Sequence, residues 1–279
     1  MARIYPRFPG GLSHALTLSY DDGVETDRRL IDIMRAHGLN GTFNINAGCF
    51  APEGTVYPAG TIHRRMPRSD CLALYRDSGM EVALHGYRHA WLPYLPRTEM
   101  LEEIARDRRE LETMFGTLVR GGAYAYGAYN DDAVDVLRIC GIVYCRTCHE
   151  SHSLNLPLDW LRLAPTCHHN DPKLFELLDT FLSTAPDRPF LFYLWGHSYE
   201  FESHDNWQRI EEFAERAGCR DDVWYATNVE IYDYMDAYHR LRFSLDGSFV
   251  CNPTATTVWF WREGKNVSVD PGATLRFSE

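Results

Sequence analysis

Apolar positions follow two alternating spacings from near the start of the chain to about residue 240. Short runs with the two-residue period of a strand predict strands over 14–20, 41–48, 80–86, 118–124, 142–147, 189–196 and 223–227. Amphipathic segments after them predict helices over 26–38, 69–78, 97–116, 131–140, 171–184, 206–217 and 228–240. This alternation indicates an α/β fold with a parallel sheet covered by helices. We expect about seven strand–helix units in a closed or nearly closed barrel, with an open doubly wound sheet as the alternative.

The pattern changes near Arg242, where short strands and turn residues replace the strand–helix units. The stretches "SFVCN", "TTVWFWREG" and "ATLRF" have strand spacing and no helical segment between them. We therefore expect a barrel domain over 1–241 and a small β extension over 242–279 that packs on it.

Charge and hydropathy narrow the possible partners. The net charge is −11, from 28 basic and 39 acidic residues, so no basic face is expected for nucleic acid or for an anionic membrane. No apolar run reaches the roughly 18–20 residues of a membrane span. The first residues lack the apolar core of a signal peptide. We expect a cytoplasmic protein without nucleic-acid or membrane partners, and no motif predicts its oligomeric state.

Polar side chains gather where the predicted strands end. In chain order they are Asp21, Asp22, Asn44, Asn46, His85, His89, Tyr124, Tyr126, His197 and Asn228. Parallel barrels carry their chemistry at the carboxyl ends of the strands. We therefore expect these side chains to form a single site.

His85 and His89 are four residues apart, a spacing that places both imidazoles on one side of a helical turn. Asp22 or Asp21 would complete a set of two histidines and one carboxylate, which leaves positions open for water and substrate. The remaining carboxylate would take a proton from the attacking water. Alternatively, one of the two aspartates only caps the helix that begins near Thr26.

With these residues the chain resembles the polysaccharide deacetylases of carbohydrate esterase family 4, which share the NodB homology domain. Ser19-Tyr20-Asp21-Asp22-Gly23 is similar to the family's T-F-D-D-G motif, and His85-Gly86-Tyr87-Arg88-His89 to its H-[ST]-x-x-H motif. The strand "FLFYLWGHS" with His197 is similar to its L-x-H motif. The resemblance spans roughly residues 14–240. It implies a distorted (β/α) barrel that removes acetyl groups from a sugar or polysaccharide, with an N-acetyl amino sugar favoured, by metal-activated water.

The resemblance also implies roles for single residues. Asp22, His85 and His89 would bind one divalent metal, with zinc expected first and cobalt, nickel or manganese as alternatives. Asp21 would be the catalytic base, and His197 the general acid that protonates the leaving group. The alternatives left open are a related metal-dependent amide or formamide hydrolase and a catalytically degenerate barrel that only binds a glycan.

Two motifs depart from the family pattern. In R-x-P-[FY]-G, whose arginine orients the base, alignment on Gly127 places Ala123 at the arginine position. Arg120 and Arg88 are the candidates to take over that role. The dipeptide Asp159-Trp160 is similar in type and order to a pair that supports the acid in the family.

Further side chains near the strand ends are candidates for substrate contact. They are Asn46, Tyr87, Trp91, Tyr126, His168 and Tyr199. The aromatic rings among them would stack on a sugar, although packing at the rim of the barrel explains them equally well. "CRTCHE", with Cys145 and Cys148, invites a structural zinc interpretation. We expect buried thiols instead, because Cys145 lies on a predicted core strand.

Overall fold

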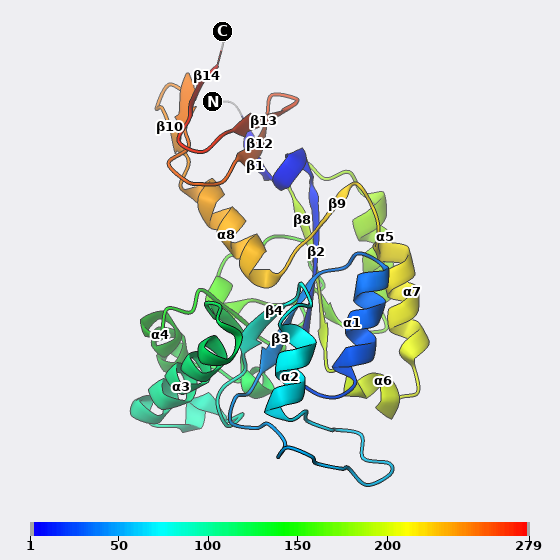
Figure 1. Cartoon of the computed structure of the whole chain (residues 1–279). Helices are drawn as coiled ribbons and strands as arrows, with labels where there is room; N and C mark the ends of the chain where they lie inside the picture. The colour runs from blue at the N-terminus through cyan, green and yellow to red at the C-terminus, as the bar shows by residue number, and fades with distance from the viewer. Residues whose placement is uncertain (1–2, 278–279) are drawn as a thin grey trace.

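The computed structural model describes residues 3–277 and is built around one curled parallel sheet (Figure 1). The strand order is β6-β5-β4-β3-β2-β8-β7, and β9 pairs with the start of β2. The bounds are β2 (His14–Asp21), β3 (Gly41–Ile45), β4 (Glu81–Leu84), β5 (Gly121–Ala123), β6 (Tyr144–Arg146), β7 (Cys167–His168), β8 (Phe190–Gly196) and β9 (Val223–Tyr225). The order ends at β6 and β7, so the barrel is not closed by strand pairing there. The predicted α/β class and distorted barrel are confirmed.

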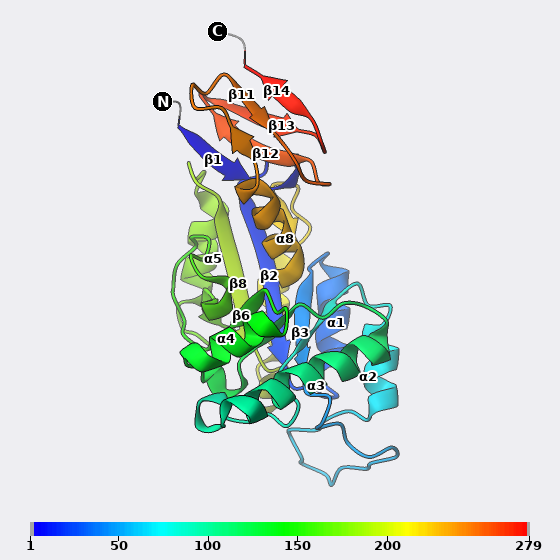
Figure 2. The same cartoon turned by 90° about the vertical axis from the view of Figure 1, so that its left-hand side faces the viewer.

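Helices cover the outside of the curled sheet (Figure 2). They are α1 (Asp27–Ala36), α2 (Arg68–Tyr75), α3 (Arg97–Phe115), α4 (Asp131–Ile139), α5 (Leu174–Ser183), α6 (Tyr199–Ser203), α7 (Trp207–Ala217) and α8 (Asn228–His239). The two-residue strand β7 and the five-residue helix α6 have no counterpart among the predicted elements.

β2 is the central strand of the molecule. All eight of its residues are buried, and it pairs with β3, β8 and β9. Its sequence alternates: Leu16, Leu18 and Tyr20 belong to the main hydrophobic cluster, while the side chains between and after them are polar, buried and hydrogen-bonded. Since its carboxyl end is Asp21, the strand carries a carboxylate into the middle of the sheet edge.

Neither Asp21 nor Asp22 caps the helix that follows them. Asp27, the first residue of α1, instead ties down the turn before the helix, because its Oδ2 accepts hydrogen bonds from the Val24 N–H at 3.1 Å and from the Tyr75 hydroxyl at 2.5 Å. The Thr26 side chain makes no capping bond to the helix. The two strand-end carboxylates are therefore left for another use.

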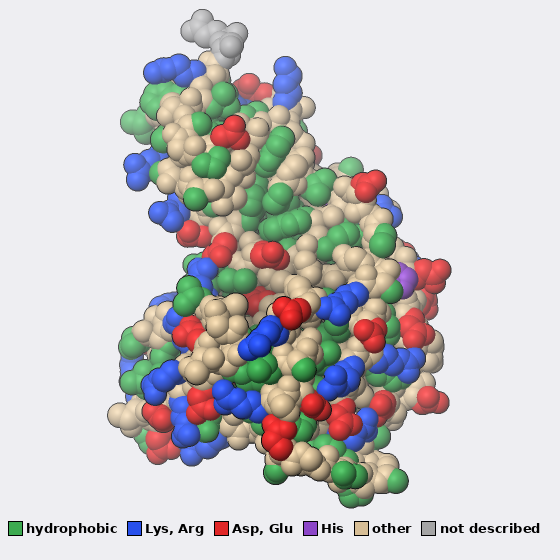
Figure 3. Space-filling view, in the orientation of Figure 1, with side chains coloured by type: hydrophobic (Ala, Val, Ile, Leu, Met, Phe, Trp, Pro, Cys, Tyr) green, Lys and Arg blue, Asp and Glu red, His purple; other side chains and the backbone are tan. Residues whose placement is uncertain are grey.

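The β extension contains both ends of the described chain. β1 (Ile4–Arg7) pairs with β12 (Val258–Arg262), which pairs with β13 (Lys265–Val269). A second small sheet holds β10 (Arg242–Phe243), β11 (Phe249–Cys251) and β14 (Thr274–Arg276). The extension lies beyond the amino end of β2 and is set off by a narrower waist (Figures 1 and 3). A division into domains at residues 241 and 242 stays a prediction, and residues 1–2 and 278–279 lie outside the described part.

Within residues 3–277, the structure contains no helix with the length and apolar character that a membrane crossing needs.

Candidate metal and catalytic site

The strand ends bring five predicted residues together at the carboxyl edge of the sheet. His85 Nε2 and His197 Nε2 each lie 3.8 Å from Asp21 Oδ2. His89 Nε2 lies 3.8 Å from Asp22 Oδ1. These side chains lie at or shortly after the carboxyl ends of β2, β4 and β8. Because parallel strands end at the same edge of the sheet, residues as far apart in sequence as Asp21 and His197 become neighbours.

Asp22, His85 and His89 each offer one ligand atom, and these atoms lie within 4.8 Å of one another. The two Nε2 atoms of His85 and His89 are 3.2 Å apart. His85 Nδ1 donates to the Ala123 carbonyl at 2.9 Å, which leaves the lone pair of its neutral ring on Nε2. Burial lowers the pKa of His85, and burial together with His85 lowers the pKa of His89 to about 4. Two neutral imidazoles facing a carboxylate fit a divalent metal.

Three residues of the site hold left-handed backbone. φ is 83° at Asp22, 56° at His89 and 58° at Tyr126. Such a conformation costs a residue other than glycine on the order of 1–3 kcal/mol, and it persists only where the surroundings enforce it. The concentration of these residues here supports a functional role for this edge.

Two residues that the sequence did not reveal hold the Asp22 carboxylate. His63 Nε2 lies 3.0 Å from Asp22 Oδ2, and Arg65 donates to Asp22 Oδ1 at 2.6 Å. Arg65 also donates to Asn46 Oδ1 at 2.8 Å. Burial raises the pKa of Asp22, but the His63 hydrogen bond and the Arg65 charge outweigh it and leave that pKa well below its usual range.

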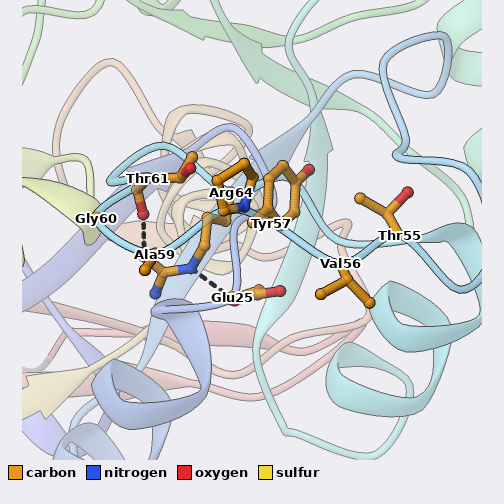
Figure 4. Close-up of a pocket in the computed structure, with 9 residues that line it drawn as sticks. Glu25, Thr55, Val56, Tyr57, Ala59, Gly60, Thr61 and Arg64 are labelled. Carbon is orange, nitrogen blue, oxygen red and sulfur yellow. Dashed lines mark hydrogen bonds and ion pairs between the residues drawn. The ribbon is translucent and has the colours of Figure 1, made fainter.

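His63 and Arg65 lie on the long loop 46–67 between β3 and α2. Between them, Arg64 points the other way, to Glu25 at 2.7 Å and Glu202 at 3.0 Å. Arg64 and Glu25 also border a hollow of about 380 Å³ lined by residues 55–61 (Figure 4). The hollow contains none of the predicted site residues. Arg64 thus anchors the loop while its neighbours reach Asp22.

Asp21 is buried and paired with Arg146, at the end of β6. Its Oδ2 accepts a hydrogen bond from the Arg146 guanidinium, and its Oδ1 accepts one from the Asn44 side-chain amide at 2.8 Å. Burial raises the pKa of Asp21, but Arg146 outweighs this effect and the pKa is lowered. The fully buried guanidinium also stacks over the Trp195 ring, 4.4 Å from its centroid.

The arginine expected to orient the base is therefore neither of the two candidates from the sequence. Arg120 pairs with Asp233 at 2.8 Å, and Arg88 pairs with Glu103. Arg146 takes that position from the strand next to the one that carries the family motif. The sequence feature that could have identified Arg146 is its place as a charged residue at the end of the apolar run "IVYCRT".

His197 has a carboxylate partner three residues along the chain. His197 Nδ1 lies 3.2 Å from Glu200 Oε1, in α6. Burial lowers the pKa of His197, but the Glu200 hydrogen bond and the Asp21 charge outweigh it, so the pKa is raised. Asp159, expected from the sequence to support the acid, instead accepts the Leu161 N–H at 2.9 Å and pairs with Arg162. This expectation is corrected in favour of Glu200.

Three aromatic residues proposed for substrate contact surround the metal-ligand set. The Trp91 and Tyr126 rings stack with centroids 4.6 Å apart, and Tyr126 lies 4.5 Å from the His89 ring. Trp91 is 46% exposed and Tyr126 is 53% exposed. Tyr199 lies between His63, at 4.8 Å, and His197, at 5.2 Å. These rings form an accessible rim beside the site.

The other substrate candidates have partners within the chain. Asn46 is fully buried, and its amide donates to the carbonyls of His85 and Gly86 at 2.7 and 2.6 Å. The Tyr87 ring lies under the Arg106 guanidinium at 4.0 Å. His168 Nε2 lies 3.0 Å from Glu200 Oε2. Asn46 therefore holds the turn that carries His85 and His89, the two candidate metal ligands.

All the cysteines of the described residues are free thiols. Burial raises the pKa of the Cys145 thiol well above its usual value and also raises the pKa of the Cys148 thiol. None of the candidate metal-ligand groups in residues 3–277 contains either cysteine.

Residues 11–145 match the model of the family described as polysaccharide deacetylase. No match was found among curated proteins. The structure is similar to a Mycobacterium smegmatis protein provisionally assigned as a polysaccharide deacetylase, at 18% identity and a TM-score of 0.59, over 84% of this chain and 94% of that chain. For the Xyl-CE4 domain of a multidomain xylanase from the hindgut metagenome of Trinervitermes trinervoides, the identity is 15% and the TM-score 0.50, over 80% and 92% of the chains.

For the Streptococcus pyogenes deacetylase PplD, in complex with acetate, the identity is 16% and the TM-score 0.42. The alignment covers 47% of this chain and 55% of that chain, so this chain spans about half the length of that deacetylase. At these identities, the first two likenesses show a shared fold, and this third one adds no further argument.

Proposed function

Residues 11–145 belong to the polysaccharide deacetylase family, and from this premise we propose that the protein is a metal-dependent deacetylase of an acetylated sugar or polysaccharide, with an N-acetyl amino sugar as the favoured substrate. One observation carries the proposal. An ionised carboxylate, Asp21, and a histidine with a raised pKa, His197, lie beside the Asp22–His85–His89 set. This pairing supplies a base and an acid at one place.

In this proposal Asp22, His85 and His89 hold one divalent metal, for which zinc is the best fit to two imidazoles and a carboxylate. Such an ion, when bound, polarises an acyl oxygen and acidifies a water molecule. The same two-histidine, one-carboxylate set leaves coordination positions open for the acetyl group and the water.

The chain's own residues move the protons. Asp21 accepts a proton from the attacking water, and Arg146 keeps that carboxylate ionised and fixed in direction. His197 then donates a proton from Nε2 to the leaving nitrogen or oxygen, while Glu200 holds the ring through Nδ1. An amine or alkoxide leaves far more easily once it is protonated, so this donation assists the step in which the leaving group departs.

The exposed Trp91–Tyr126 pair favours a sugar over the small formamide or cyclic amide of the alternative. Stacked aromatic rings beside the ligand set offer a flat apolar face of the kind that contacts the C–H groups of a sugar ring. The retained Asp21, His197 and ligand residues argue against a barrel that only binds a glycan.

An acetate-release screen with known metal content tests this function. Metal-loaded protein is offered N-acetylglucosamine oligomers, peptidoglycan fragments and acetylated xylan, and free acetate is measured. We expect release from at least one N-acetylated substrate and none after chelation. A fully loaded protein that releases no acetate from any of them, yet hydrolyses a formamide, would replace this proposal with the amide hydrolase.

A further inference from the structure

A second group of potential ligands lies behind His197. His168, at the end of β7, is followed by His169, and both rings face Glu200 of α6. The Nε2 atoms of both histidines lie 3.0 Å from Glu200 Oε2. The side chains of His168, His169 and Glu200 are 17%, 1% and 20% exposed. None of them belongs to the Asp22–His85–His89 set.

The contacts in this group are close, yet they are not hydrogen bonds. His169 Nδ1, His169 Nε2 and Glu200 Oε2 are all buried without a hydrogen-bond partner. The buried hydroxyl of Tyr20, whose ring stacks on His169 with centroids 5.7 Å apart, also has no partner. Each such group costs about 1–3 kcal/mol. The ring nitrogens are within reach of the carboxylate oxygen but are not aimed at it.

We propose that His168, His169 and Glu200 bind a second divalent cation of the zinc class. Two ligand atoms about 2.1 Å from one ion are separated by roughly 3.4 Å at the tetrahedral angle and by roughly 3.0 Å at 90°. Both nitrogen–oxygen distances in the group are 3.0 Å. The Nε2 lone pairs of the two histidines do not point at Glu200 Oε2, but they would point at an ion placed between the three side chains. Two imidazoles and one carboxylate are a donor set that zinc accepts.

The charges of the group suit a cation. Burial lowers the pKa of His169 to about 4, so the ring is neutral near pH 7 and offers a lone pair. The Glu200 carboxylate supplies a negative charge beside the two rings. A buried ion would therefore meet a compensating charge.

One existing contact changes when the ion binds. His168 Nδ1 accepts the Asn170 N–H at 3.1 Å. A neutral ring that binds a cation through Nε2 carries its proton on Nδ1, so this contact has to open. We therefore expect His168 to be the weakest of the three ligands.

The site is connected to the proposed acid through one carboxylate. Glu200 Oε2 faces the two histidines, while Oε1 stays with His197 Nδ1. An ion on Oε2 would fix the carboxylate that orients His197.

A neighbouring group offers a contrast. His152 Nε2 lies 2.5 Å from Asp171 Oδ2, which is hydrogen-bond distance, and the His152 side chain is 37% exposed. Glu150 completes this group. No atom of these three residues is among the buried unpartnered atoms of residues 3–277. Their contacts are explained without an ion, which makes His152→Ala a matched control.

Zinc stoichiometry tests the inference independently of activity. Metal-free protein is loaded with zinc, dialysed and analysed for zinc per chain. We expect about two equivalents in the parent and in His152→Ala, about one in His169→Leu and in His85→Ala, and none in the double variant. If His169→Leu does not fold, Glu200→Gln replaces it, because it keeps the size of the side chain and removes the charge.

Two results would overturn the second site. The first is a parent that holds one equivalent, lost in His85→Ala and kept in His169→Leu. The second is loss of one equivalent in His152→Ala with none lost in His169→Leu. By contrast, one equivalent that survives in His85→Ala and is lost in His169→Leu would support the second site and contradict the first. The test thus separates this inference from the proposed deacetylase function.

Discussion

Substitution of Asp21 tests its proposed role as the catalytic base. Asp21→Asn keeps the size of the side chain, but an amide cannot accept the proton of the attacking water. We expect turnover to fall by about 10²–10⁴-fold while zinc content stays that of the parent. Acetate release and metal analysis on the same sample check this. Near-normal turnover would place the base at another residue.

Arg146 and Arg120 form a matched pair of substitutions. Arg146→Met removes one partner of a fully buried ion pair and should destabilise the fold by about 3–5 kcal/mol, besides abolishing turnover. Arg120→Met breaks a surface pair and should cost less than about 1 kcal/mol. Urea denaturation measures both. If both variants lose an equally small amount of unfolding free energy, the Arg146–Asp21 pair does not stabilise the fold as a buried ion pair.

The proposed acid role of His197 predicts a pH dependence. In that role His197 donates only when protonated, so we expect activity to fall as pH rises through its pKa. Glu200 raises that pKa, after burial has lowered it. Glu200→Gln removes the raising charge, so the fall in activity should move to lower pH. A kcat/KM profile over pH, compared with the parent with the Asp22–His85–His89 set loaded in both proteins, measures the shift. An unmoved basic limb would show that another group sets it.

Single residues were predictable where the motif is contiguous in sequence. Asp21, Asp22, His85 and His89 lie within short linear patterns, so the sequence was sufficient to predict that they meet. The partners that tune them come from distant positions: Arg146 from the end of β6, and His63 and Arg65 from a loop. Sequence spacing carries no signal for such contacts, because only the folded sheet creates them.

At the scale of elements, the long strands and helices were predictable from their apolar periods. β7 and α6 were not, since two and five residues are too few to show a period. These two short elements carry His168, which the sequence offered as a candidate, and Glu200, which it did not.

Arg64 is one of the anchors of the loop 46–67, and its contribution is testable. Arg64→Ala removes the pairs with Glu25 and Glu202, worth together about 0.5–2 kcal/mol, or roughly a 2–30-fold change in loop opening. Limited chymotrypsin digestion at Tyr57 should accelerate by a corresponding factor. Arg68→Ala, which breaks only a 3.8 Å pair with Glu110, is the control. Equal digestion rates in both variants would contradict the anchoring role.

At the scale of the whole molecule, the chain ends support one another. β1 pairs with β12, and the Tyr234 hydroxyl of α8 donates to the Arg7 carbonyl at 2.8 Å and accepts the Trp259 N–H at 2.9 Å. A chain cut after residue 241 leaves β1 without a sheet partner. We expect a lower melting temperature and retained zinc binding, because the ligand set lies at the other end of β2. Loss of zinc in a folded truncated chain would show that the extension supports the site.

The position of the β extension also determines how the protein can be fused to another protein or immobilised on a solid support. β1 and β14 lie at the end of the molecule that is remote from the carboxyl ends of β2 and β8 (Figure 1). A fusion partner or a tether to a solid support at either terminus would therefore leave the strand ends facing outward. Polymeric material too large to diffuse freely could still reach an immobilised layer of such molecules.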